Sequence, residues 1–138
     1  MTPRVLSLPF REVVDPVCEV YGLPRGLFND FCFWTVEGTH DLYLVPAGAN
    51  HPTTLRDLDE LGHRVCTGPE RRPTSTLLKM IGADARRNVV EVDADGEVRF
   101  NRGEVLELPE DCDATVLIVR RGRHALGGLT RLTGRSAP

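Results

Sequence analysis

Glycine and proline divide this chain into short segments. The 138 residues include 13 glycines and 10 prolines, and they separate the apolar stretches repeatedly, as at Gly22, Pro46, Gly62 and Gly122. Because both residue types tend to end helices and strands, only short elements are expected. The apolar content of 41% and the charged content of 27% are ordinary for a globular protein. The chain is therefore expected to fold as one domain, or as two small ones, built from short helices and strands.

The first half predicts a helix, a hairpin and a second helix. Apolar residues at positions 10, 13, 14, 17 and 21 have the spacing of an amphipathic helix, which Pro16 is expected to break or kink. Two apolar stretches, at 31–36 and 41–45, flank a turn and predict a hairpin. Thr54 and Asp57 resemble a capping box at the start of a helix that Gly62 ends.

The second half predicts more short strands around one short helix. Pro73 to Ser75 should open a helix that places Leu77, Leu78 and Ile81 on one face. Strands are expected at 88–92, at 114–119 and at 124–132. Asp95-Gly96 predicts a hairpin within 93–103, and Gly127-Gly128 predicts a bulge or a close backbone approach. Many short strands with glycine turns favour a small, partly open barrel.

Charge is distributed unevenly along the chain. Residues 1–63 carry four arginines and nine acidic residues, whereas residues 64–138 carry thirteen basic and eleven acidic residues. No acidic residue follows Asp113, although five arginines do, Arg131 and Arg135 among them. A stretch with charge of one sign creates a local positive field even in a chain with a net charge of −3. Arginine binds phosphate well because its planar group makes two parallel hydrogen bonds.

We find no catalytic, metal or cofactor motif. Phosphate-binding loops, dinucleotide glycine motifs and nucleophile elbows are missing from the sequence. His63 and Cys66 would lie on opposite faces of a strand, and no cysteine pair has the short spacing typical of zinc sites. The four cysteines are expected to be reduced, buried thiols. No apolar run is long enough for a membrane span and no signal peptide is apparent, so a cytoplasmic protein is expected.

Three segments of the second half resemble a PUA domain, the RNA-binding module of pseudouridine synthases and archaeosine transglycosylases. They are RRPTSTLLKMIGADARRNVVEVD (71–93), FNRGEVLEL (100–108) and ATVLIVRRGRHALGGLTRL (114–132). The similarity is greatest to the PUA-like extension of the Nop/Sun family of RNA cytosine methyltransferases, in which a short helix precedes the Arg-Gly-Glu motif. Residues 10–61 are similar to the small subdomain that precedes some PUA domains. The catalytic domain of that family has no counterpart here, so no methyltransferase activity is implied.

The resemblance implies an α+β fold: a pre-PUA-like α/β subdomain over 1–62, followed by a PUA-like, partly open β-barrel over 63–138. The implied function is non-catalytic binding of structured RNA, tRNA or rRNA, in RNA modification or ribosome biogenesis. Its interface would use residues beside the short helix and residues on the last hairpin. These are Arg71, Arg72, Thr74, Lys79, Arg86 and Arg87, and then Arg120, Arg121, Arg123, His124 and Gly127.

In a PUA-like barrel the two sets of arginines would converge on one groove. Arg120 and Arg121 are adjacent in a strand and cannot both point the same way, so one of them is expected to be structural. Two other functions stay open. The chain could be an adaptor in a complex with an RNA-modifying enzyme, with its acidic half against a basic partner. It could also be a small-molecule enzyme, which would need a pocket with convergent polar groups.

Overall fold

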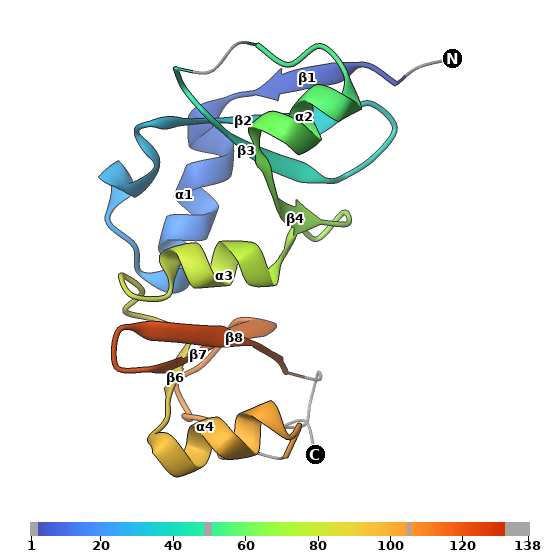
Figure 1. Cartoon of the computed structure of the whole chain (residues 1–138). Coiled ribbons are helices and arrows are strands. Elements are labelled where there is room, and N and C mark those ends of the chain that lie inside the picture. Colours follow the sequence, from blue (N-terminus) through green and yellow to red (C-terminus); the bar gives the residue numbers. More distant parts are fainter. Residues whose placement is uncertain (1–2, 49–50, 105, 132–138) are drawn as a thin grey trace. The chain divides into compact units, whose positions relative to one another are not determined.

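The computed structural model describes residues 3–48, 51–104 and 106–131 (Figure 1). The fold is mixed α+β, with a five-stranded and a three-stranded sheet. Contacts divide the chain into two compact units. The N-terminal unit comprises residues 1–19 and 24–77, and the C-terminal unit comprises residues 20–23 and 78–138. None of the described helices is both long enough and apolar enough to cross a membrane.

The N-terminal unit is built on an antiparallel sheet with strands in sequence order. Its strands are β1 (Val5–Leu8), β2 (Phe31–Val36), β3 (Leu42–Pro46), β4 (His63–Thr67) and β5 (Arg72–Pro73). Its helices are α1 (Phe10–Tyr21), the 3-10 helix η1 (Arg25–Phe28) and α2 (Leu55–Leu61), and α3 (Ser75–Ile81) begins in it. The predicted hairpin is confirmed, because β2 pairs with β3 through Phe33 and Leu44.

Helix α1 continues through Pro16, so the predicted break is wrong. Proline has no backbone N–H, and the carbonyl of Glu12, four residues earlier, therefore lacks its usual partner. The guanidinium of Arg71 donates to this carbonyl at 3.5 Å. The helix is also held by its buried face, where Val13 and Val14 are almost fully covered. Packing of that face explains why one proline does not end the helix.

Helix α2 begins as predicted. The Thr54 side chain accepts a hydrogen bond from the backbone N–H of Asp57 at 3.2 Å, and the Asp57 carboxylate accepts one from the N–H of Thr54 at 3.3 Å. This reciprocal capping box satisfies donors that the first helical turn leaves free. Gly62 follows the helix where a side chain would collide with β3, since a Cβ there would lie 2.6 Å from the carbonyl oxygen of Leu44.

The C-terminal unit has a three-stranded sheet with helices on both faces. Strand β7 (Val116–Arg121) lies between β6 (Val89–Glu91), which is parallel to it, and β8 (His124–Thr130), which is antiparallel. Leu117 and Val119 point to one face and pack in a core with Phe100 of α4 (Ala94–Asn101). On the other face, the end of α3 lies so close to β8 that a Cβ on Gly128 would be 2.4 Å from the side chain of Leu78.

The predicted hairpin within 93–103 is wrong, because these residues form helix α4, where the resemblance placed a short helix. The Asp93 side chain caps the helix by accepting from the N–H of Gly96 at 2.8 Å. Gly96 itself is helical, and a Cβ at this position would lie 2.8 Å from the Cβ of Val92. Asp93 therefore serves as the N-cap of α4 and Gly96 as a close-contact residue. Asp95 and Gly96 do not form the predicted turn.

The sheets are not closed into a barrel. Each described sheet is open, and they remain two separate sheets of five and three strands. The division into units also falls at a different place from the boundary expected at 62/63. Strand β4, His63–Thr67, pairs with β3 in the N-terminal unit, and the contacts divide between Leu77 and Leu78.

Candidate nucleic-acid interface

Arg120 is held inside the C-terminal unit. Its Nε donates to the Glu91 carboxylate at 2.5 Å, and its Nη1 donates to the carbonyl oxygens of Gly82 and Ala85 at 2.7 and 2.8 Å. The side chain is only 18% exposed. Charge-assisted hydrogen bonds of this kind are strong. Arg120 therefore fixes the segment after α3 against β7, and its Nε and Nη1 donate to acceptors of the protein itself.

Arg121 is the exposed member of the pair, as strand alternation requires. Its side chain is 51% exposed, and its nearest carboxylate is that of Glu97 at 3.6 Å. Arg123 and His124 follow in the β7–β8 turn and at the start of β8, and both are exposed. In the described part of the chain, neither of these two has an ion-pair partner. The turn therefore presents cationic groups to solvent.

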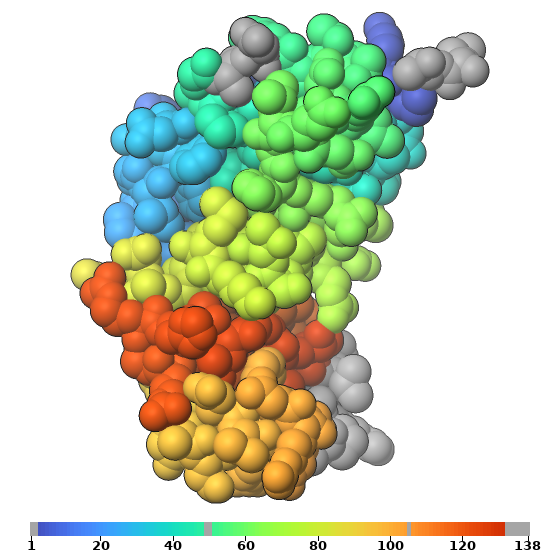
Figure 2. Space-filling model, in the orientation of Figure 1, coloured from blue at the N-terminus to red at the C-terminus, as the bar shows by residue number. Residues whose placement is uncertain are grey.

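The segment after α3 carries Arg86, which is exposed and has no carboxylate partner among the residues with described positions. The backbone N–H of Arg86 donates to the carbonyl of Tyr21 at 2.9 Å, which fixes the main chain here. Figure 2 shows this yellow-green segment beside the orange-red β7–β8 turn, in agreement with the Arg120 contacts to Gly82 and Ala85. We call Arg86, Arg121, Arg123 and His124 the basic edge.

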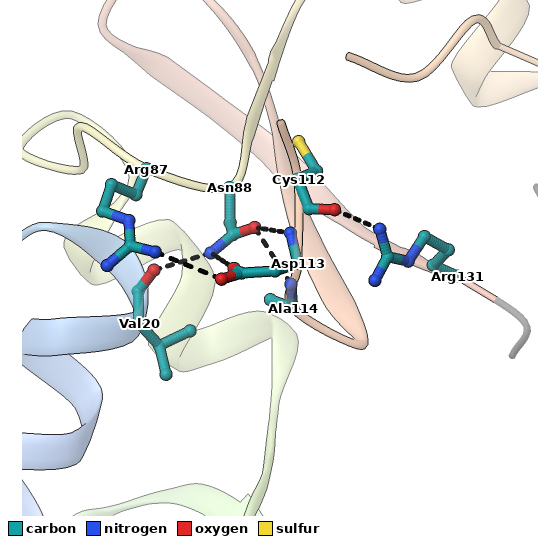
Figure 3. Close-up of polar contacts among 7 residues, drawn as sticks. All are labelled: Val20, Arg87, Asn88, Cys112, Asp113, Ala114 and Arg131. Carbon is teal, nitrogen blue, oxygen red and sulfur yellow. Dashed lines mark hydrogen bonds and ion pairs between the residues drawn. The ribbon is translucent and has the colours of Figure 1, made fainter. Parts of the chain in front are cut away.

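Arg87 takes part in a polar network with Asn88 and Asp113 (Figure 3). It donates to the Asp113 carboxylate at 3.2 Å. The Asn88 amide donates to the carbonyl of Val20 at 2.7 Å and to Asp113 at 2.9 Å, and its oxygen accepts from the N–H groups of Asp113 and Ala114 at 2.8 and 3.0 Å. These contacts make Arg87 part of the packing between β6 and the start of β7.

Local sequence patterns did not identify Asn88, a polar residue that is buried in this unit. Its backbone is left-handed, with φ of 59°. Asparagine adopts this conformation more readily than most residues, and an asparagine directly before an apolar strand was the available signal. The hydrogen bond from Asn88 also holds the pKa of Asp113 below its usual value of 3.8, with a smaller contribution from Arg87.

Arg71, Arg72 and Thr74 belong to the N-terminal unit. The Thr74 hydroxyl donates to the carbonyl of Arg64 at 2.9 Å and accepts from the N–H of Leu77 at 3.3 Å, so it caps α3. Arg71 donates to the carbonyl of Glu12, as described above. The hairpin arginines lie in the other unit, so convergence of the two sets on one groove stays a prediction.

Lys79 and Gly127 differ in accessibility. Lys79 is exposed on α3, opposite the buried side chains of Leu78 and Ile81. Gly127 is buried, and a Cβ there would lie 3.4 Å from the ring of Phe100. Its φ of 154° favours glycine. Gly127 thus lets α4 approach the sheet, and it lies beside a register shift between Val119 and Arg120. Its backbone is not open to a ligand, although the predicted interface includes this residue.

His63 and Cys66 differ in accessibility. Cys66 is buried, and burial raises the pKa of its thiol to about 11, which keeps it protonated at neutral pH, whereas His63 is exposed. Cys18 and Cys112 are buried, but Cys32 is exposed, contrary to expectation.

Arg131 donates to the carbonyl of Cys112, and Arg135 lies outside the described residues. Within residues 3–48, 51–104 and 106–131, no group of three or more His, Cys, Asp or Glu side chains could hold a metal ion.

Comparison of the chain with protein-family models, with curated proteins and with solved structures gives no match.

Proposed function

We propose that this protein binds structured RNA without catalysing a reaction, and that the basic edge contacts RNA phosphates. The observation that carries the proposal is the uncompensated charge of two exposed arginines, Arg86 and Arg123. Neither is neutralised by a carboxylate in the described residues. In the N-terminal unit, Arg4, Arg25 and Arg56 each pair with an acidic side chain, whereas Arg11 is exposed and has no such partner among the described residues.

Rigid placement of these cations supports the proposal. Arg120 ties the segment that precedes Arg86 to β7, the strand that ends at Arg121 and is followed by Arg123. Cations on a fixed frame lose less conformational entropy when they bind phosphate than cations on loose segments. The acid-free sequence after Asp113 adds to the positive field around the β7–β8 turn.

Shape recognition suits the interface better than base recognition. Among its four residues the basic edge offers one aromatic ring, the His124 imidazole, whereas modules that read single-stranded bases stack two or three of them on aromatic side chains. We therefore propose tRNA or rRNA as the class of ligand, and RNA modification or ribosome biogenesis as the setting. The PUA-like character of the C-terminal unit is part of the same proposal, in an open rather than a closed form.

Filter binding with tRNA over a range of salt concentrations tests the proposal. With about four phosphate contacts, the logarithm of the binding constant should fall against the logarithm of salt with a slope of roughly −3 to −4. Single-stranded polyuridine should bind more weakly at the same salt concentration. Absence of tRNA binding at about 50 mM salt, where charge contacts are strong, would exclude the RNA-binding function.

A further inference from the structure

The N-terminal unit contains a polar cavity that is separate from the basic edge. Its volume is about 520 Å³, within the range of small-molecule sites. Its lining comes from the sheet, from α2 and from the start of α3. The lining residues are Tyr43, Asp59, Gly62, His63, Arg64, Thr74, Ser75 and Thr76.

The sheet places two of the functional groups on the same face. Tyr43 on β3 is the direct cross-strand partner of Arg64 on β4, and such partners project to the same side. The start of α3 is fixed beside β4 by Thr74, whose hydroxyl donates to the backbone carbonyl of Arg64 at 2.9 Å. Asp59 extends from α2 beside the fully buried Leu58, which packs against Tyr43.

The Tyr43 hydroxyl lacks a partner. The residue is only 6% exposed, yet among described residues its hydroxyl makes no hydrogen bond. No fully buried side-chain polar atom of the described structure is unsatisfied, so this hydroxyl must reach the open space of the cavity. The pKa of Tyr43 is raised chiefly by burial and then by Asp59, while Arg64 lowers it. Tyr43, Asp59 and Arg64 all line the cavity, so one ligand that fills it can contact all three.

Arg64 is available to an anion. Its guanidinium lies 4.0 Å from the Asp41 carboxylate, which is beyond hydrogen-bond distance, and its side chain is 55% exposed. The cavity thus combines one guanidinium, one carboxylate and three hydroxyls that are not used elsewhere, those of Tyr43, Ser75 and Thr76. A ligand with hydroxyls at one end and an anion at the other matches this set.

We propose that this cavity binds the ribose phosphate group of a ribonucleotide. Asp59 accepts hydrogen bonds from the ribose hydroxyls, as carboxylates do in dinucleotide sites. Arg64 binds the phosphate through its planar donors, and the Tyr43 hydroxyl makes the buried hydrogen bond. The group can come from a free nucleotide or from the 3′ end of an RNA strand, since both carry a ribose diol and a phosphate.

Titration of the full chain, followed by backbone amide shifts in NMR, tests this site. The probes are adenosine 5′-phosphate, its 2′-deoxy analogue, inorganic phosphate, and a short oligoribonucleotide with a free 3′ end. Binding of both adenosine 5′-phosphate and the oligoribonucleotide supports the site and shows that a free nucleotide can supply the ribose phosphate. Binding of the oligoribonucleotide alone supports the site and identifies the 3′ end of an RNA strand as the source. The 2′-deoxy analogue should bind at least about fivefold more weakly. Equal affinity for both nucleotides, equal affinity for phosphate, or no binding by any probe would overturn the proposal.

Three variants localise the effect. Tyr43→Phe keeps the ring and should weaken nucleotide binding about three- to tenfold. Asp59→Asn, at an exposed position, should remove the preference for ribose and tests the site even if the Tyr43 variant unfolds. Arg56→Gln, on α2 but outside the cavity, is the control and should bind as the wild type does. Nucleotide binding unaffected by both Tyr43→Phe and Asp59→Asn would show that the cavity is not the site.

Discussion

Asn88 makes four side-chain hydrogen bonds while it is only 6% exposed. Asn88→Ala would leave the N–H groups of Asp113 and Ala114 and the carbonyl of Val20 without these partners. It would also put alanine in a left-handed conformation. We expect a loss of about 2–4 kcal/mol in the free energy of unfolding, measured by urea denaturation.

The control for this prediction is Asn101→Ala. Asn101 is exposed at the end of α4, and its replacement should change stability by less than about 0.5 kcal/mol. Similar losses in the two variants would contradict the role assigned to the Asn88 network.

The Asp113 carboxylate makes stability depend on pH. Its pKa is lowered from 3.8 in the folded protein, first by the hydrogen bond from Asn88, so folding favours the charged form. The resulting stability is present above the unfolded pKa and is lost as the pH falls toward the folded pKa. Asp113→Asn should therefore make the unfolding free energy fall less steeply below about pH 4. Urea unfolding curves at several acidic pH values measure this slope, and unchanged slopes would contradict the account.

The adjacent Arg120 and Arg121 show how far a sequence pattern predicts the role of a single residue. Strand alternation predicts that only one of Arg120 and Arg121 faces solvent, and this is confirmed by their exposures of 18% and 51%. Which of them is structural depends on the carbonyls of Gly82 and Ala85, more than thirty residues away. Acceptors that distant in the chain are placed by tertiary packing, which local patterns do not encode.

At the scale of elements, two glycines, Gly82 and Gly128, set how closely α3 approaches β8. A Cβ on Gly82 would lie 2.3 Å from the Cβ of Ala125 and 2.9 Å from the carbonyl oxygen of Leu78. Gly82→Ala should therefore separate the helix from the strand and destabilise the protein by about 1–3 kcal/mol. The measurement is the urea midpoint. Gly48→Ala is the control, because a Cβ there meets nothing within 4 Å, and equal midpoints for the two variants would refute the close-packing argument.

Elements with local signals were predicted well. The capping box of α2 uses Thr54 and Asp57, three residues apart, and is confirmed. The β2–β3 hairpin and helix α3 were also expected in place. The Asp95-Gly96 hairpin failed because the same residue types begin helices, and here Asp93 caps α4 while Gly96 packs on Val92. The break predicted at Pro16 failed for another reason, since the buried face of α1 outweighs one missing hydrogen bond.

At the scale of the whole molecule, sequence predicted the α+β class but not how its sheets are built. Strand β4 follows the change in charge balance, yet it completes the N-terminal sheet by pairing with β3. Charge patterns describe surfaces, whereas strand pairing depends on buried faces such as Val65 and Cys66 of β4. The same distinction applies to the predicted interface. Charge identified Arg121 and Arg123 as surface cations, but it also selected Arg120, whose guanidinium binds the protein itself.

The central claim is that the basic edge binds RNA, and a comparison of two triple variants tests it most directly. The first variant changes Arg86, Arg121 and Arg123 to alanine. The second changes Arg4, Arg25 and Arg56, which are exposed and paired with carboxylates in the N-terminal unit. Replacing an exposed charge usually shifts stability by no more than about 0.5 kcal/mol, so both variants should stay folded.

The measurement is the affinity for tRNA as a function of salt. The first variant should bind more weakly, and its salt slope should shrink by about one unit for each lost phosphate contact. The second should keep the slope and nearly all of the affinity of the wild type. Equal losses in the two variants, or a larger loss in the second, would contradict the assignment of RNA binding to the basic edge.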